Sequence, residues 1–491
     1  MPDSLPIWTR EEVARRILDG EYLLIRYGNV LKIPEKWLSS HPGGALAILH
    51  FIGRDASQEM DVYHSEDTFK RMNVYIVARI RLPWNPLLPP LMSGWVRTKT
   101  GWQKDATPSQ VLLLKNATFN LQPPPTSLSL EIQEQHVKAY RELHHRIKQA
   151  GLYETPYITG YGPEVIRYTL LIVSSAYAYY HSWFLVSATL LGALWHQLAF
   201  FAHDLGHNGV THKWTLDRLL GILVADLLGG VSIGWWVDNH NIHHLVTNHP
   251  AHDPDIQHVP FFAITPAFFT NLWSTYYKRV MLFDSIAAML VSVQHKLFYI
   301  VLSLARFNLY ANSYSFLALR ARRTWHWYME TLALTVFWIW YGLLLFGIRD
   351  PKVAMAYLLV SNMVASPVHV QIVLSHFSRS TEDLGPVESF PARQLRTTVD
   401  VICPSYLAFL HGGLHLQVTH HLFPRLPRHN LRAASKLVKE YARDQGLEYA
   451  EFGFMEGNEQ VRGVLQQVAQ QVHIIKKVAD ANIQERLSTC S

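Results

Sequence analysis

Cysteine is almost absent from this sequence. Only Cys403 and Cys490 occur among 491 residues, so there is no disulfide framework, and we expect the soluble parts to face the reducing cytosol. Charged residues are also few, at 17% against 49% hydrophobic residues, which excludes an ordinary soluble protein of this length. The first residues, Met1-Pro-Asp-Ser-Leu5, have neither a basic nor an apolar region, so no cleaved signal peptide is expected.

A basic patch is missing as well. The net charge of +6 and the pI near 9.1 would by themselves suit a nucleic-acid partner. The lysines and arginines, however, are not clustered with interleaved aromatic residues. They flank long apolar segments, which is the positive-inside pattern of membrane proteins. We therefore expect membrane lipids as partners and no nucleic acid.

About four of the apolar segments are long enough to cross a bilayer. Residues 165–202 are almost uncharged and are broken near His181-Ser182, which leaves two spans of roughly 17–20 residues. Residues 325–348 and 353–375 form a second pair. Two further apolar segments are expected to lie in the membrane interface or against the bundle: residues 216–236 and 295–317.

The cationic residues give these spans an orientation. The loops of the two hairpins contain only Arg349 and Lys352, and almost all other lysines and arginines lie on the opposite side. That side is therefore expected to be cytosolic. Since both hairpins return to it, the sequence predicts a multi-pass protein whose two termini are both cytosolic.

Histidine is abundant, with 27 residues, and much of it is gathered into clusters beside apolar segments. The three clusters are His203-Asp-Leu-Gly-His207, His240-Asn-Ile-His243-His244 and Gln417-Val-Thr-His420-His421. Helix positions i, i+3 and i+4 share one face, so each cluster can direct its side chains at one point. Imidazole suits Zn, Cu, Fe and Ni, and seven or more nitrogen ligands exceed the four of one tetrahedral zinc. The pattern favours two metal ions, with iron the expected metal.

A second histidine pattern lies near the N-terminus. His41-Pro-Gly-Gly44 is followed 23 residues later by His64. Taken alone, the first motif could be a simple turn, since Pro and Gly interrupt regular structure. Apolar side chains between the two histidines could instead line a cofactor pocket: Leu46, Ile48, Leu49, Phe51 and Ile52.

Together these patterns resemble a known family. The three clusters, in this order and beside membrane segments, are similar to the histidine boxes of membrane fatty-acyl and sphingolipid desaturases. Gln417, which opens the third box, is typical of the front-end group, whose members carry a fused cytochrome b5 domain. His41 and His64, with Trp8, Val30 and Trp37, resemble that domain, in which the two histidines are the axial ligands of a haem.

The resemblance implies a set of cofactors and ligands. Haem b would be held by His41 and His64, and two non-haem iron ions would use O2 as co-substrate. The implied iron ligands are His203, His207, His240, His243, His244, His376, Gln417, His420 and His421. His376 is chosen because it follows the last span, and His369, seven residues earlier, is the alternative. Asp253 and Asp255, which match a family motif, could orient the ligands from behind.

The resemblance also implies a domain organisation. The fold class is an α-helical integral membrane domain with about four transmembrane helices and a cytosolic histidine-rich cap, joined to a small N-terminal α+β cytochrome b5-like domain. The expected parts are the haem domain at residues 1–85, a linker with a helix at 86–160, the desaturase domain at 161–435, and a cytosolic tail at 436–491. Electrons would come from NADH through NADH-cytochrome b5 reductase, at the endoplasmic reticulum membrane.

Three functions remain open. Residues 47–56, 397–404, 409–414 and 420–431 look most like the fungal Δ8-sphingolipid desaturases, which place a trans double bond at carbon 8 of a ceramide's long-chain base. Gly412-Gly413 could leave room for the ceramide head group. The alternatives are a front-end acyl-lipid desaturase or hydroxylase on the same di-iron scaffold, and a membrane haem electron carrier whose histidines bind structural zinc.

Overall fold

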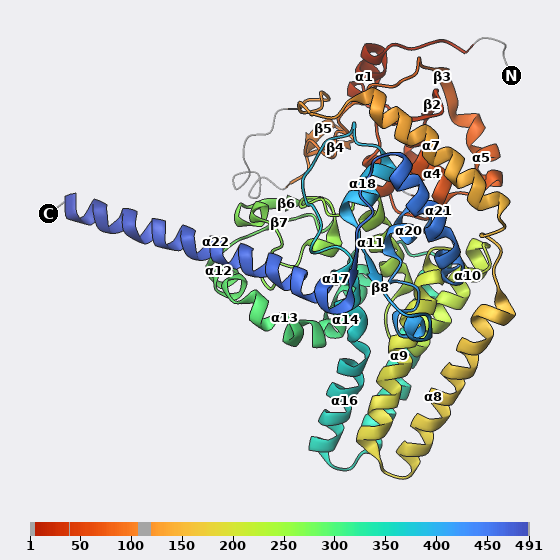
Figure 1. Cartoon of the computed structure of the whole chain (residues 1–491), viewed down its shortest axis with the longest axis vertical. Helices are drawn as coiled ribbons and strands as arrows, with labels where there is room; N and C mark the ends of the chain where they lie inside the picture. Colours follow the sequence, from red (N-terminus) through yellow and green to blue (C-terminus); the bar gives the residue numbers. More distant parts are fainter. Residues whose placement is uncertain (1–4, 39, 107–118, 490–491) are drawn as a thin grey trace.

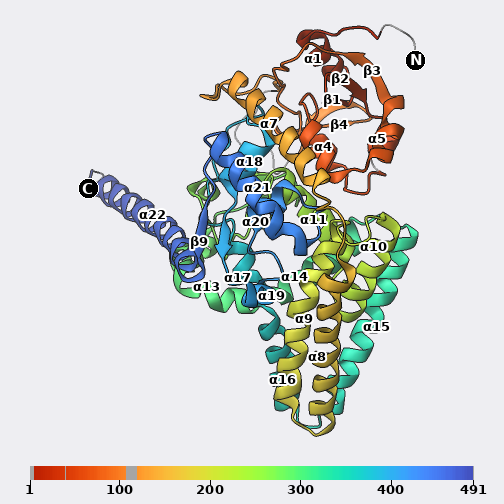
Figure 2. The ribbon, with the colours of Figure 1, turned by 45° about the vertical axis from the view of Figure 1, so that its right-hand side comes forward.

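The computed structural model describes residues 5–38, 40–106 and 119–489. The chain is arranged in three parts along its long axis (Figure 1, and Figure 2 after a 45° turn). A small N-terminal domain lies at one end, and long helices project at the other. A middle part built from short helices lies between them and connects the two.

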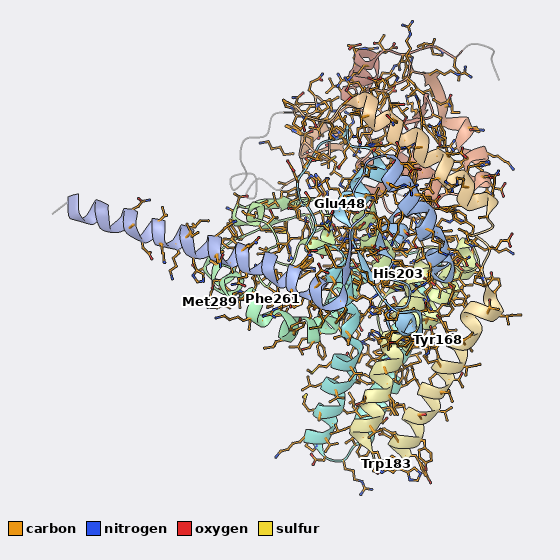
Figure 3. All side chains as sticks on the ribbon, in the orientation of Figure 1. Tyr168, Trp183, His203, Phe261, Met289 and Glu448 are labelled. Carbon is orange, nitrogen blue, oxygen red and sulfur yellow. The ribbon has the colours of Figure 1, made fainter. Side chains whose placement is uncertain are left out.

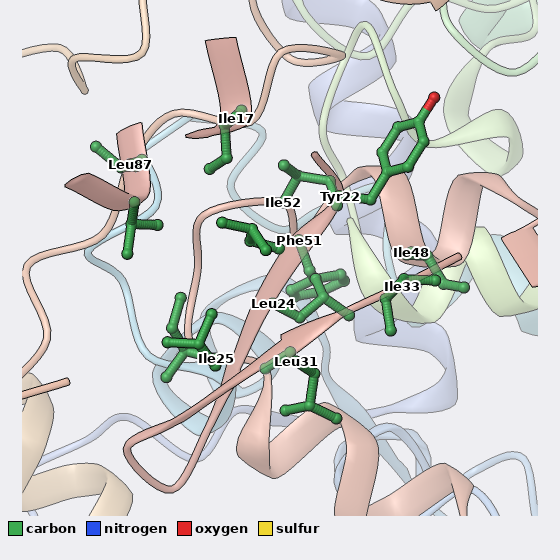
Figure 4. Packing of buried hydrophobic residues seen from close by; sticks show 14 of the residues in the cluster. Ile17, Tyr22, Leu24, Ile25, Leu31, Ile33, Ile48, Phe51, Ile52 and Leu87 are labelled. Atoms are coloured by element: carbon green, nitrogen blue, oxygen red, sulfur yellow. The ribbon is translucent and has the colours of Figure 1, made fainter. Parts of the chain in front are cut away.

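The N-terminal domain contains a three-stranded antiparallel sheet with the order β1-β2-β3. The strands are β1 (Leu23–Arg26), β2 (Asn29–Lys32) and β3 (Ile76–Arg79). Tyr27 and Gly28 both have positive φ, as a two-residue hairpin turn requires. The helices are α1 (Arg10–Leu18), α2 (Glu35–Leu38), α3 (Leu46–Leu49), α4 (Ser57–Tyr63) and α5 (Glu66–Met72). The apolar faces of the strands and helices meet in one core (Figure 4). Together they form the small α+β domain that the sequence predicts.

The long helices form the opposite end of the molecule. They are α8 (Gly162–Tyr180), α9 (Phe184–Gly206), α15 (Trp325–Gly347), and α16 (Pro351–Ala365) followed by α17 (Pro367–Leu374). Within the described ranges, three segments are long and apolar enough to cross a membrane: Phe184–Gly206, Trp325–Gly347 and Pro351–Leu374. The α8 helix carries Glu164 and Arg167 and is not one of them, although it lies beside α9 (Figure 2).

Two apolar segments form bent pairs. In the first, α10 (Trp214–Gly221) and the π-helical η3 (Ile222–Leu228) meet α11 (Ile233–Leu245) at 112°. The bend falls at Gly229-Gly230, where Gly230 has a φ of +72°. In the second, α12 (Ser285–Ser292) meets α13 (Gln294–Ser303) at 94°, and α14 (Ala305–Leu319) follows. Counting each bent pair as one span gives up to five spans.

The middle part is a helical cap with its own core. It contains α7 (Leu130–Gln149), α18 (Phe390–Thr397), α20 (Gln417–Leu422) and α21 (Leu431–Asp444). Tyr140 of α7 is buried and stacks on Phe423, with ring centroids 5.3 Å apart. The α7 helix, expected within a linker, therefore packs as part of this cap.

The remaining elements lie around the cap. The short strands are β4 (Trp95–Thr98), β5 (Gly101–Lys104), β6 (Leu272–Ser274), β7 (Arg279–Met281), β8 (Asp400–Ile402) and β9 (Glu451–Gly453). The short helical turns are η1 (Asn73–Tyr75), η2 (Tyr157–Tyr161), η4 (Pro254–Ile256), η5 (Pro266–Phe269), η6 (Ser405–Leu407), α19 (Ala408–His411) and η7 (Arg428–Asn430). The long α22 (Phe454–Thr489) packs through Val461, Leu465 and Val468 beside α12 and α13, and then extends away from the body (Figure 1).

Candidate functional site

The three histidine clusters meet where the long helices enter the cap. His203 lies near the end of α9, at the opposite end of that helix from Trp183 (Figure 3). His207 follows directly as the C-cap of α9, the second cluster lies on α11, and the third on α20. All of these side chains are buried. The structure thus brings together residues that are more than 200 positions apart in the chain.

The histidines form two groups whose ring nitrogens converge. In each group, one nitrogen from every residue lies within 4.8 Å of the others. The first group is His203, His207, His240 and His420, and the second is His243, His376 and His421. His244 lies between the groups. Its Nε2 is 3.1 Å from Nε2 of His240 and 3.2 Å from Nε2 of His420, and its ring stacks on His421 at 4.0 Å.

The distances of 3.1 and 3.2 Å between Nε2 of His244 and its two neighbours fit a shared metal ion. Two nitrogens that each lie about 2.0–2.1 Å from a metal are about 2.9–3.4 Å apart in tetrahedral or octahedral geometry. Without a cation, three converging Nε2 atoms cannot all be satisfied, because one shared proton serves only one pair. Both ring nitrogens of His203 and His207 are buried and have no hydrogen-bond partner among the residues that the structure describes, and the same holds for Nε2 of His243 and His421. So many unpaired nitrogens in a buried site indicate lone pairs that are aimed at metal.

The charge state of these imidazoles also suits metal binding. Burial, together with neighbouring imidazoles, holds the pKa of His207, His420 and His421 well below the ordinary range. Burial has the same effect on the pKa of His376. These side chains are therefore neutral near pH 7, and a metal ion would not have to displace protons from them.

His376, and not His369, lies in the cluster. His376 follows α17, and its ring centroid is 4.6 Å from that of His243 and 4.7 Å from that of His421. Gln417 lies beside it, with the amide nitrogen 3.3 Å from His376 Nε2. Its Oε1 is buried and has no hydrogen-bond partner within the described part of the chain. His369, within α17, belongs to neither group of the described residues.

Carboxylates hold two of the imidazoles from behind. Nδ1 of His243 donates to Asp253 at 2.9 Å, and Asp253 is completely buried. Nδ1 of His240 lies 3.4 Å from Asp255. Such contacts fix the ring orientation and leave Nε2 free for a metal. The structure therefore places both aspartates where they can orient ligands, as the sequence motif suggested.

Two further residues support the cluster and were not identified from the sequence. Gln394 of α18 accepts from Nδ1 of His421 at 2.9 Å and donates to the backbone oxygen of His244 at 2.8 Å. Trp236 stacks on His240 with ring centroids 4.3 Å apart. Trp236 precedes His240 by four positions, so helix spacing could have indicated it. No sequence signal pointed to Gln394.

The expectation for Gly412-Gly413 is wrong. Both residues have positive φ, +53° and +86°. An added Cβ at Gly412 would lie 2.0 Å from the Phe200 ring, and one at Gly413 would lie 2.8 Å from Cβ of Arg428. The space beside these glycines is already filled by protein, so they serve a tight turn and give no room for a head group.

His41 and His64 face each other across a cavity in the N-terminal domain. Their ring centroids are 6.0 Å apart. Nδ1 of each donates to a backbone oxygen, of Gly44 and of Met60, both at 3.0 Å, so each Nε2 is left for a ligand. Burial lowers the pKa of both rings, for His64 to about 4. The cavity measures about 610 Å³ and has apolar walls that include Leu24 and Phe51, which suits a haem between two neutral imidazoles.

This cavity reaches the histidine cluster. Its walls include His207 and Asn241, whose neighbour His240 belongs to the first metal group. A buried ion pair also joins the two domains, because Arg393 of α18 lies 3.3 Å from Glu59 of α4. The haem pocket and the metal cluster are therefore direct neighbours in one folded unit.

Comparison with known proteins gives a family for each of the two domains. Residues 180–453 match the model of the fatty acid desaturase family, and residues 9–81 match the cytochrome b5-like haem/steroid binding domain. The chain belongs to the fatty acid desaturase family. This desaturase is an oxidoreductase and a membrane protein, and the predicted fold class of a helical membrane domain with a fused cytochrome b5-like domain is confirmed. The family implies iron, and the fused domain implies haem.

The relatives extend over nearly the whole desaturase. A protein of Emericella nidulans is 41% identical over 96% of this chain and 95% of its own length. A protein of Komagataella phaffii is 40% identical over 95% and 94%, and one of Kluyveromyces lactis is 38% identical over 98% and 96%. All three are named Delta 8-(E)-sphingolipid desaturase.

Proposed function

We propose that this desaturase introduces a trans double bond at carbon 8 of the long-chain base of a ceramide. The observation that carries the proposal is the full-length similarity, at 38–41% identity, to three Delta 8-(E)-sphingolipid desaturases. It is supported by a haem pocket and a metal cluster that lie side by side. A metal cluster that can use O2, beside a haem that can supply electrons, suits the oxidation of an unactivated carbon chain.

The overall reaction balances. The substrate loses two hydrogens from adjacent methylenes, and O2 takes up those two, two electrons and two further protons, which gives one double bond and two molecules of water. Two bound iron ions would supply the oxidising chemistry at the methylenes, and haem b would deliver the electrons singly. The protein holds these groups and excludes bulk water, since every imidazole of the two metal groups is buried.

We assign the ligands from the two groups. One iron would be held by His203, His207, His240 and His420, and the other by His243, His376 and His421. His244 lies close to both sets, and Gln417 lies beside His376 of the second. Asp253 and Gln394 keep the rings of His243 and His421 in position. His41 and His64 would be the axial haem ligands.

The same proposal includes a place and an electron supply. NADH-cytochrome b5 reductase would pass electrons from NADH to the haem at the endoplasmic reticulum membrane. The hairpin ends at His181 and at Arg349 would face the lumen, and the haem domain and both termini would face the cytosol. The helix α8, beside α9, would act as a fourth span despite its two charges near the cap.

The direct test is expression in a yeast that makes no Δ8-unsaturated long-chain bases, followed by mass spectrometry of its lipids. We expect a new trans double bond at carbon 8 of the sphingoid base and unchanged acyl chains. The matched control is His244→Ala, which should give expressed protein and no product. New acyl double bonds with unaltered long-chain bases would replace the proposal with a front-end acyl-lipid desaturase.

Metal analysis tests the remaining alternative. We expect about two non-haem irons for each chain. A purified protein that contains zinc in place of iron, carries haem and consumes no O2 with substrate would instead be a membrane haem electron carrier.

A further inference from the structure

The haem cavity is built by both domains. Besides His41 and His64, its walls include side chains from the desaturase domain, among them His207, Trp214 and Arg425. A haem in this cavity would therefore meet residues that the cytochrome b5-like domain alone does not provide. A cation among these residues would balance the negative charges of a bound haem.

The fully charged side chains around the cavity differ in how they are paired. Glu59 forms the ion pair with Arg393, and Arg218 lies 2.6 Å from Glu330. Arg71 is exposed to water. These three groups are compensated by a partner or by solvent.

Arg425 is paired less completely. It is half-buried, and its Nε is shielded from solvent and has no hydrogen-bond partner among the described residues. Among the described residues, no carboxylate forms an ion pair with its guanidinium. A donor that is removed from water and gains no partner is costly, so this position favours an anion that binds beside the guanidinium.

Haem b carries two propionate groups, and guanidinium is the side chain that pairs best with a carboxylate, through two parallel hydrogen bonds. We infer that Arg425 binds a haem propionate, so that the desaturase domain completes the haem site. The inference depends on the haem assignment in the proposed function. Arg425 follows α20 and is four residues from His421, so one short segment would contact both the haem and the metal cluster.

The test uses the full-length purified protein and two variants, Arg425→Gln and Arg425→Lys. Loss of a positive charge beside the haem favours the ferric state. In Arg425→Gln we expect the reduction equilibrium constant of the haem to fall about tenfold, or about 59 mV for one electron. We also expect haem transfer to apomyoglobin to be about tenfold faster, with an unchanged low-spin bis-histidine spectrum. Arg425→Lys keeps the charge and should remain close to wild type.

The control is Arg146→Gln, which removes an arginine of a surface ion pair with Glu440, away from the cavity, and should change neither value. If Arg425→Gln keeps the potential and the haem release of the wild type, the inference is wrong while the haem site stands. If the haem potential of Arg425→Lys is lowered as far as that of Arg425→Gln, the positive charge is not the cause, and the inference is again wrong. A wild-type protein that binds no haem would refute the haem assignment itself.

Discussion

Asp253 offers the sharpest test of how the metal cluster is held. It is completely buried and accepts three hydrogen bonds, from His243 Nδ1 at 2.9 Å and from the backbone N–H groups of Asn248 at 2.7 Å and Asp255 at 2.8 Å. The two backbone groups bind different oxygens. In Asp253→Asn one oxygen becomes NH2, and a backbone N–H then faces another donor whichever way the amide turns. One buried unpaired donor costs about 1–3 kcal/mol.

That cost lowers the stability of the fold with and without metal. Metal binding should weaken for a separate reason, because loss of a carboxylate that orients a ligating imidazole lowers metal affinity about 10–100-fold, or about 1.4–2.7 kcal/mol. We expect the iron content of Asp253→Asn, measured by elemental analysis over a series of chelator concentrations, to fall at about 10–100-fold less chelator than in the wild type. Product formation should fall with it.

A matched control is available in the same region. Asp383 also pairs with a histidine, His249 at 3.3 Å, but it is 44% exposed and does not contact either metal group. Asp383→Asn should therefore bind iron as the wild type does. Equal iron affinity in wild type and Asp253→Asn would refute the role of Asp253, and equal loss in both variants would show that the effect is not specific to the cluster.

The other predictions concern single residues. His64→Ala should abolish the haem absorption spectrum and leave the non-haem iron in place, and a normal spectrum would contradict the axial assignment. His376→Ala should abolish product and lower the iron content, whereas His369→Ala should keep its iron; the reverse result would exchange their roles. Gly413→Leu should destabilise the fold by about 1–3 kcal/mol, because its φ is +86° and Arg428 occupies the space. Thermal unfolding measures this change, and an unchanged melting temperature would contradict the argument.

The sequence could predict what depends on local spacing. The histidine clusters fall on α9, α11 and α20 as their i, i+3 and i+4 spacing implies, and the break near Ser182 lies in the turn between α8 and α9. The structure also places His376, which was chosen by its position after the last span, beside His243. Its role as a ligand stays a prediction.

What the sequence could not predict depends on contacts between distant segments. Gln394 has no spacing relation to His421 or His244. The packing of α18 against α20 brings it to His421, and its hydrogen bond to the backbone oxygen of His244 joins α18 to α11. The role of Gly412 was misjudged because its neighbour Phe200 is 212 positions away in the chain. The bend at Gly229-Gly230 was missed because an apolar composition indicates how long a buried segment is and not the angle between its helices.

The shared wall of the haem cavity has a consequence for how the protein is assembled in the cell. The N-terminal domain leaves the ribosome first and, as domains generally do, folds as a unit. Haem would then reach the cavity before the desaturase residues that line it have been made. Once the later segments fold against the N-terminal domain, they would obstruct release of the haem. Haem loading would thus depend on the order of synthesis, and a defect in the desaturase half would show first as a haem that is inserted normally and then lost.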